Sequence, residues 1–239
     1  MPMSLEDEWI LVASGLIAHA DGVLEAEEVD RLLGMLGHDT DPELYSEWLT
    51  FFCDHDALER RYAAMAEPSE DEAQRILEQA WAMAMVDGEH APDEVKVLHR
   101  IGARFGLGVE DIERRREAWD IRLDGFATLA AECAAFILGG SAGVSGEDAK
   151  CFSHFIDRLP TAPNHREELR EIRGTGDVDA LGPRVGRLGA RMREQCLRLL
   201  APLVHDSKAP DDARTRYYDF AERSGSTEAA AEAHLRATR

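Results

Sequence analysis

Apolar residues recur at steps of three and four along most of this chain, the spacing that places side chains on one face of an α-helix. The first segment shows the pattern most clearly. Its apolar stripe consists of Leu5, Trp9, Val12, Ala13, Leu16, Ile17 and Ala20. Later stripes are divided by helix-starting signals, such as the capping box from Ser69 to Glu72 and the proline at position 92. The pattern therefore predicts an all-α helical bundle.

The same spacing predicts further helices between residues 110 and 203. We expect a short charged helix from Glu110 to Trp119, followed by a separate apolar helix from Phe126 to Ile137. The stripe from Val185 to Leu203 predicts one helix bent at Pro202, because proline lacks a backbone donor. Its opposite face carries Arg184, Arg187, Arg191 and Arg198. That face is interpreted as solvated or as a docking surface for acidic groups.

Four sharp corners connect the predicted helices. The first two, Asp21 to Glu28 and Asp87 to Glu94, both read Asp-Gly, five residues, Glu. The third, at Ala142, lacks the acid, and the fourth, at Asp206, lacks the glycine. The first and third corners are 121 residues apart, and the second and fourth are 119 apart. This spacing predicts two tandem domains, residues 1–120 and 121–239, each built from two related helical hairpins; chance similarity of helix-turn-helix units is the alternative.

The two predicted domains differ in net charge. The net charge is −20, and residues 1–120 hold 29 Asp and Glu against 10 Lys and Arg, whereas residues 121–239 are nearly neutral. An acidic surface repels phosphate backbones and anionic lipids, so we expect no nucleic-acid partner. Cations and basic proteins are the expected partners, while the oligomeric state is left open.

The composition of the chain bears on its cellular compartment and on whether it contains a catalytic motif. No apolar run approaches the roughly 18 residues of a membrane span, and the first residues carry no basic signal-peptide region, so we expect a cytoplasmic protein. The four cysteines form no Cys-x-x-Cys pair and are expected to be buried thiols. There is no phosphate-binding loop and no Gly-x-Ser-x-Gly elbow. We therefore expect a protein that is not an enzyme.

The residues around the first two corners resemble a known family. Trp81 to Glu94, with Val95, Leu98, Ile101 and the ending Phe105-Gly106-Leu107, is similar to the second half of a TerB-like domain, the helical module of tellurite-resistance and DjlA-type proteins. Leu16 to Glu28 resembles its first half. The resemblance is clear for residues 5–118 and weak for residues 125–225.

This resemblance implies an all-α bundle in which the two corners approach each other across a pseudo-twofold axis. It also implies a metal site at the corners and a role in stress-response complexes of the tellurite type, without catalysis. The implied metal ligands are Asp21, Glu28, Asp87 and Glu94.

The residue types at the corners allow the same site. Carboxylates are hard oxygen ligands that suit Ca²⁺, Mg²⁺ or Mn²⁺, and His19 and His90 beside the corners would shift the preference toward Zn²⁺. Asp-Gly corners also serve simply to end one helix and begin the next, since acids near a helix N-terminus are favourable. On that interpretation the protein is a metal-independent helical adaptor, which takes a partner helix in a groove or on exposed aromatic residues around Trp48 and Phe52.

Overall fold

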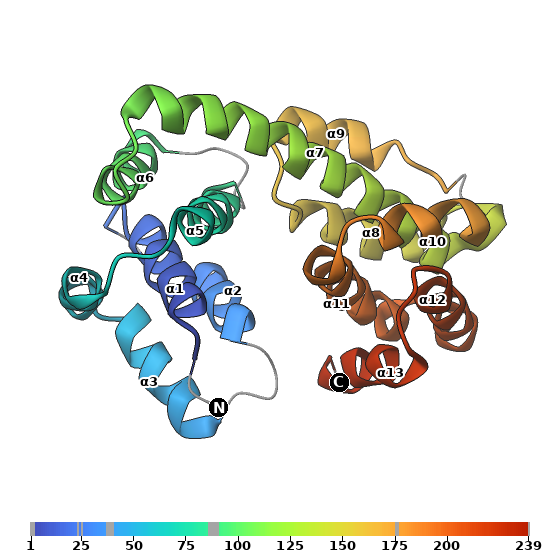
Figure 1. Cartoon of the computed structure of the whole chain (residues 1–239). Coiled ribbons are helices and arrows are strands. Elements are labelled where there is room, and N and C mark those ends of the chain that lie inside the picture. Colours follow the sequence, from blue (N-terminus) through green and yellow to red (C-terminus); the bar gives the residue numbers. More distant parts are fainter. Residues whose placement is uncertain are drawn as a thin grey trace. The chain divides into compact units, whose positions relative to one another are not determined.

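The computed structural model describes residues 3–22, 24, 26–36, 41–85, 91–174 and 177–238. Within these residues the chain forms helices and no strand, which confirms the predicted all-α class (Figure 1). The helices belong to two compact units, residues 1–123 and 124–239. None of the described helices combines the length and the apolar character needed to cross a membrane. That each unit consists of two related hairpins stays a prediction.

The first unit is built around one central helix. Its helices are α1 (Leu5–Ala18), α2 (Ala26–Leu36), α3 (Pro42–Phe52), α4 (His55–Ala64), α5 (Glu70–Ala84), α6 (Pro92–Arg104) and the first part of α7 (Val109–Gly139). In α1 every residue from Trp9 to Ala18 is buried, because α2, α4, α5 and α6 all pack on it (Figure 1). The single stripe predicted for this helix is therefore too narrow, as a helix that is apolar all round lies at the centre of a bundle.

A single long helix, α7, replaces the two helices predicted from Glu110 to Ile137. Its span contains no proline, and its one interior glycine, Gly125, is exposed. A glycine within a helix costs about 1 kcal/mol relative to alanine and does not by itself end the helix. The boundary between the two compact units falls in the sequence between Leu123 and Asp124, within the span of α7.

The second unit packs short helices against the last part of α7. They are η1 (Gly140–Ala142), α8 (Asp148–Asp157), α9 (Pro163–Arg170), α10 (Val178–Gly186), α11 (Ala190–Asp206), α12 (Pro210–Arg223) and α13 (Glu228–Ala237). The apolar residues predicted to mark α7 are all buried here, and they include Phe126, Cys133 and Ile137. Cys196 of α11 is buried in the same core. The expectation of buried thiols is wrong for Cys53, which follows α3 at the surface.

A glycine divides the helix predicted from Val185 to Leu203 into two. Gly189 has φ 78°, a left-handed conformation that separates α10 from α11. Arg184 therefore lies on α10, where it pairs with Glu132 of α7, while Arg198 lies on α11 and pairs with Glu194. The predicted arginine face on one helix is wrong.

Candidate functional site

The first acidic corner joins α1 to α2. After α1 ends, Gly22 donates its amide to the His19 carbonyl over 3.0 Å and adopts φ 84°, a conformation that glycine accepts without strain. Asp21 lies exposed at this turn, and Glu28 is half-buried in the first turn of α2. The glycine thus turns the chain directly beside the first predicted ligand.

The second acidic corner is described only on its C-terminal side. Glu94 lies in the first turn of α6 and accepts a hydrogen bond from the Ala91 amide over 2.6 Å, so it caps this helix. Asp87 and His90 lie outside the described residues. Each of the three described carboxylates has an interaction partner; these are Asp21, Glu28 and Glu94. Among the residues that are described, no three or more His, Cys, Asp or Glu side chains form a group arranged to hold a metal ion.

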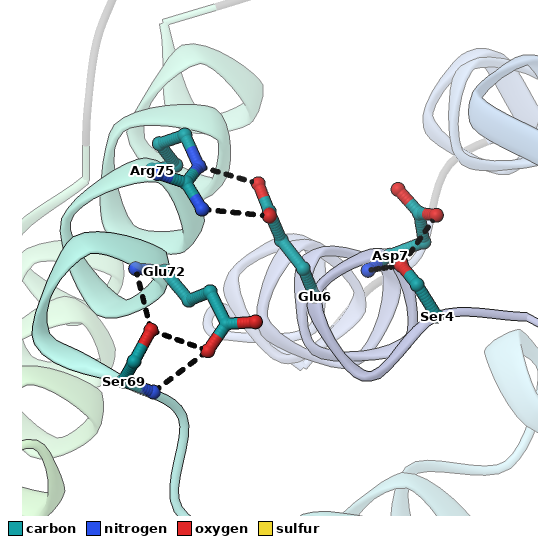
Figure 2. Close-up of polar contacts among 6 residues, drawn as sticks. All are labelled: Ser4, Glu6, Asp7, Ser69, Glu72 and Arg75. Atoms are coloured by element: carbon teal, nitrogen blue, oxygen red, sulfur yellow. Dashed lines mark hydrogen bonds and ion pairs between the residues drawn. The ribbon is translucent and has the colours of Figure 1, made fainter.

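The two helices that lead into these corners are joined at their N-termini (Figure 2). Arg75 of α5 donates from Nε and Nη2 to the two carboxylate oxygens of Glu6 of α1, over 2.8 and 2.9 Å. The predicted capping box is confirmed, with the Ser69 amide donating to Glu72 over 2.8 Å and the Glu72 amide donating to the Ser69 hydroxyl over 3.4 Å. Hydrogen bonds from Ser69 lower the pKa of Glu72 below its usual value. Helices α1 and α5 also pack on each other extensively.

The histidine beside the first corner is held by a backbone carbonyl. His19 Nε2 lies 2.6 Å from the Phe52 carbonyl oxygen, and its ring meets the His55 ring edge to face, with centroids 5.4 Å apart. A ring held through one nitrogen keeps the other, Nδ1, as a potential ligand atom, which is a common arrangement around metal-binding histidines. The orientation of His19 is therefore compatible with a ligand role.

In the second unit the two predicted corners are bonded directly to each other. Asp148, the first residue of α8, accepts hydrogen bonds from the Lys208 amide over 2.8 Å and from the Ser207 hydroxyl over 3.3 Å. The Cys151 thiol donates to the Asp206 carbonyl over 3.2 Å. The Asp148 carboxylate therefore bonds to the neighbouring corner, and the N-cap residue of α8, Glu147, makes no side-chain capping bond. Sequence spacing placed a corner at each position but gave no signal that they touch.

A second polar network has the connectivity of a hydrolase triad but a different hydrogen-bond direction. Thr128 Oγ1 lies 3.0 Å from His165 Nε2, and His165 Nδ1 lies 3.2 Å from Glu168. The Thr128 hydroxyl, however, donates to the Asp124 carbonyl over 2.8 Å, so its lone pairs and not its proton face the imidazole. An activated nucleophile needs the reverse arrangement, with the base accepting the hydroxyl proton. We interpret this network as joining α7 to α9.

Together, the helices packed around α1 define the first unit as an all-α helical module. Comparison with protein families shows which known domain this module is similar to. Residues 9–117 match the family model described as tellurite resistance protein TerB. This match confirms the resemblance to a TerB-like domain that was predicted for residues 5–118. No curated protein and no solved structure matches the chain.

Proposed function

We propose that the protein is a cytoplasmic, non-enzymatic interaction module of TerB type that binds a divalent metal ion through Asp21, Glu28, Asp87 and Glu94. The observation that carries this proposal is the pair of Asp-Gly-x5-Glu corners inside the segment that matches TerB. Metal binding would then control the association with a protein partner in a stress response of the tellurite type.

The donor chemistry of the described corner residues supports a hard cation. Asp21 is exposed, and Glu28 and Glu94 are half-buried, so their carboxylates remain accessible to an ion. The bond from the Ala91 amide to Oε2 holds the Glu94 carboxylate at the start of α6. Carboxylate oxygens suit Ca²⁺, Mg²⁺ or Mn²⁺, and His19 adds a nitrogen that suits Zn²⁺.

The second unit supports the expected convergence of the corners. There the third and fourth corners touch through Asp148, Ser207 and Lys208. If the two units are related by duplication, the corners of the first unit lie equally close, and direct packing of α1 on α5 is in line with that arrangement. In the second unit the hydrogen bonds already join the corners, so we assign the metal to the first unit.

Titration calorimetry with Ca²⁺, Mg²⁺, Mn²⁺ and Zn²⁺ tests the metal site. We expect the wild type to bind at least one of these ions and the double variant Asp21→Ala/Asp87→Ala to lose that binding, because two of the four carboxylates are removed. An ion at about 100 times its Kd stabilises the protein by about 2.7 kcal/mol, so the melting temperature of the wild type alone should rise.

The matched control is Glu43→Ala/Glu47→Ala, which removes the same charge from exposed positions of α3. It should bind the ion like the wild type. Absence of binding to the wild type, or equal binding to both double variants, rules out the corner site.

The structure favours one surface for the alternative function, a metal-independent adaptor. The expected docking residues Trp48 and Phe52 are 4% and 0% exposed, so the sequence prediction of this surface is wrong. They face inward because α3 packs on α2 and α4. On the outer face of α3, Tyr45 and Leu49 are 41% and 37% exposed, one helical turn apart.

This outer face is acidic, and its charge indicates a basic partner. Residues 41–54 contain Asp41, Glu43, Glu47 and Asp54 and no lysine or arginine. An apolar stripe with an acidic rim fits a basic amphipathic helix.

A synthetic amphipathic helix of leucine and lysine is the probe for this function. We expect it to bind in the presence of EDTA, and the variant Tyr45→Ala/Leu49→Ala to weaken its binding about tenfold, as measured by fluorescence anisotropy. The matching leucine-glutamate helix should not bind, and Asp21→Ala/Asp87→Ala should bind like the wild type. A probe that binds the α3 variant as tightly as the wild type would show that the attraction is charge alone.

A further inference from the structure

A hollow of about 380 Å³ lies between α8 and α11 in the second unit, away from the acidic corners. One face of each helix lines it. The α8 face provides Cys151, His154, Phe155 and Arg158, and the α11 face provides Leu199, Pro202, Leu203 and Asp206. Its volume falls in the range of small-molecule sites, which is about 300 to 1,000 Å³.

The two walls of this hollow, called here the α8–α11 groove, are fixed at one end. The Cys151 thiol bonds to the Asp206 carbonyl, and Asp148 bonds to Ser207 and Lys208 just beyond. Because the start of α8 meets the end of α11, the two helices run antiparallel along the groove. A groove with fixed walls is preformed, so a ligand does not have to order it.

The middle of the groove is apolar. Phe155 and Leu203 are 7% and 4% exposed and form its floor, with Leu199 and Pro202 half-buried beside them. Burial, followed by the nearby Asp206 and Asp148, raises the pKa of the Cys151 thiol above its usual value. Cys151 is therefore a neutral thiol that adds to the wall and is not an activated nucleophile.

The guanidinium of Arg158 lies at the end of the groove opposite to Asp206. Arg158 is the C-cap residue of α8 and is exposed, and His154 lies one turn before it on the same face. Neither side chain forms a hydrogen bond or an ion pair with another residue in the described part of the chain. A groove-lining guanidinium that has no carboxylate of its own is suited to pair with the carboxylate of a ligand.

We propose that the α8–α11 groove binds a medium-chain amphipathic carboxylate. The carboxylate pairs with Arg158, and the apolar chain lies over Phe155 and Leu203 toward Cys151. From Cys151 to Arg158 the wall is about 10 Å long, at 1.5 Å per helical residue, which is why a medium chain fits better than a long one. Asp206 at the far end disfavours a second negative charge there.

Decanoate is the probe, added to the full-length protein below its micelle concentration. Calorimetry should show one site, and ¹H–¹⁵N spectra should place the largest shifts on the amides of α8 and α11. The variant Arg158→Gln should raise the Kd of decanoate about tenfold or more, since it removes a charge-assisted pair. Arg187→Gln is the matched control, because Arg187 is an exposed arginine of the same unit outside the groove, and it should leave the Kd unchanged.

Two further ligands separate the head group from the chain. Decanol should bind more weakly than decanoate and equally to the wild type and Arg158→Gln, and acetate should not bind measurably. No decanoate binding, decanoate binding that Arg158→Gln leaves unchanged, or shifts outside α8 and α11 would each overturn the proposal. Acetate binding as tight as that of decanoate would overturn it as well, because the groove would then recognise an anion alone. None of these results depends on a metal at the acidic corners.

Discussion

Replacing Gly182 by alanine is expected to destabilise the second unit by about 3 kcal/mol. Gly182 is a buried residue of α10, and a Cβ added there would lie 2.4 Å from Arg223 Cβ and 2.9 Å from the Arg223 carbonyl carbon. Because these atoms belong to the end of α12, no side-chain rotation relieves the clash, and the two helices must separate. Overpacking of a core by one methyl group costs about 1 to 3 kcal/mol, and a backbone contact of this kind lies at the upper end.

Gly125→Ala is the matched control, and its effect should have the opposite sign. Gly125 is an exposed glycine in the middle of α7, and nothing lies within 4 Å of an added Cβ. Alanine should therefore stabilise the helix by about 0.5 to 1 kcal/mol. If both variants shift stability in the same direction, the close approach of α10 to α12 is not as described.

Urea unfolding separates the units in this experiment, because all four tryptophans, at positions 9, 48, 81 and 119, belong to the first unit. Tryptophan emission should follow the first unit, whereas circular dichroism follows both. The unfolding of the second unit should then appear in circular dichroism but not in tryptophan emission. Gly182→Ala should lower the midpoint of this transition by about 1 to 2 M urea.

Arg104→Ala is expected to destabilise the first unit by about 3 kcal/mol. The Arg104 guanidinium contacts two aromatic rings that meet edge to face, with its carbon 4.9 Å from the Trp9 ring centroid and 4.6 Å from that of Tyr62. It also donates to the Tyr62 carbonyl, and to the Met65 carbonyl over 2.6 Å, at the end of α4. A cation–π contact is worth about 0.5 to 2 kcal/mol, and a charged hydrogen bond is worth about 1.5 to 3 kcal/mol. Part of this sum is offset because the freed carbonyls regain water.

Tryptophan emission during urea unfolding measures this effect directly, since Trp9 is itself one of the contacts. Arg104→Lys should recover only part of the loss, because one ammonium group does not stack on two rings while bonding two carbonyls. The control Arg114→Ala removes an exposed arginine that forms a surface ion pair with Asp111, and it should change stability by less than about 0.5 kcal/mol. Equal midpoints for Arg104→Ala and Arg114→Ala would show that the aromatic pair does not depend on its cation.

Parts of the fold were predictable from the sequence because they depend on neighbours along the chain. The capping box at Ser69 and the cap at Ser4 involve residues three apart, and the structure contains both. The resemblance of the first unit to a TerB-like domain was predictable from its corners. By contrast, the continuity of α7 through Gly125 was missed, because a single glycine disfavours a helix only slightly and the packing on both sides outweighs it.

In the candidate metal site, too, some features were predictable from the sequence and others were not. Its carboxylates at Asp21, Glu28, Asp87 and Glu94 were identified by the repeated spacing, and whether they converge on one ion stays a prediction. Residues that meet across many positions of the chain gave no local signal. Asp148 reaches Lys208 over 60 residues of sequence, and the groove beside them was not foreseen.

What the sequence by itself determined is the helical class, the positions of the corners and the acidic character of the first half, since periodicity, caps and charge are local properties. Tertiary structure alone decided that α1 is buried on all sides, that Trp48 and Phe52 face inward, and that the corners of the second unit are bonded to each other. The physical reason is that burial depends on which helices pack around a given face, and the pattern along one helix does not specify its neighbours.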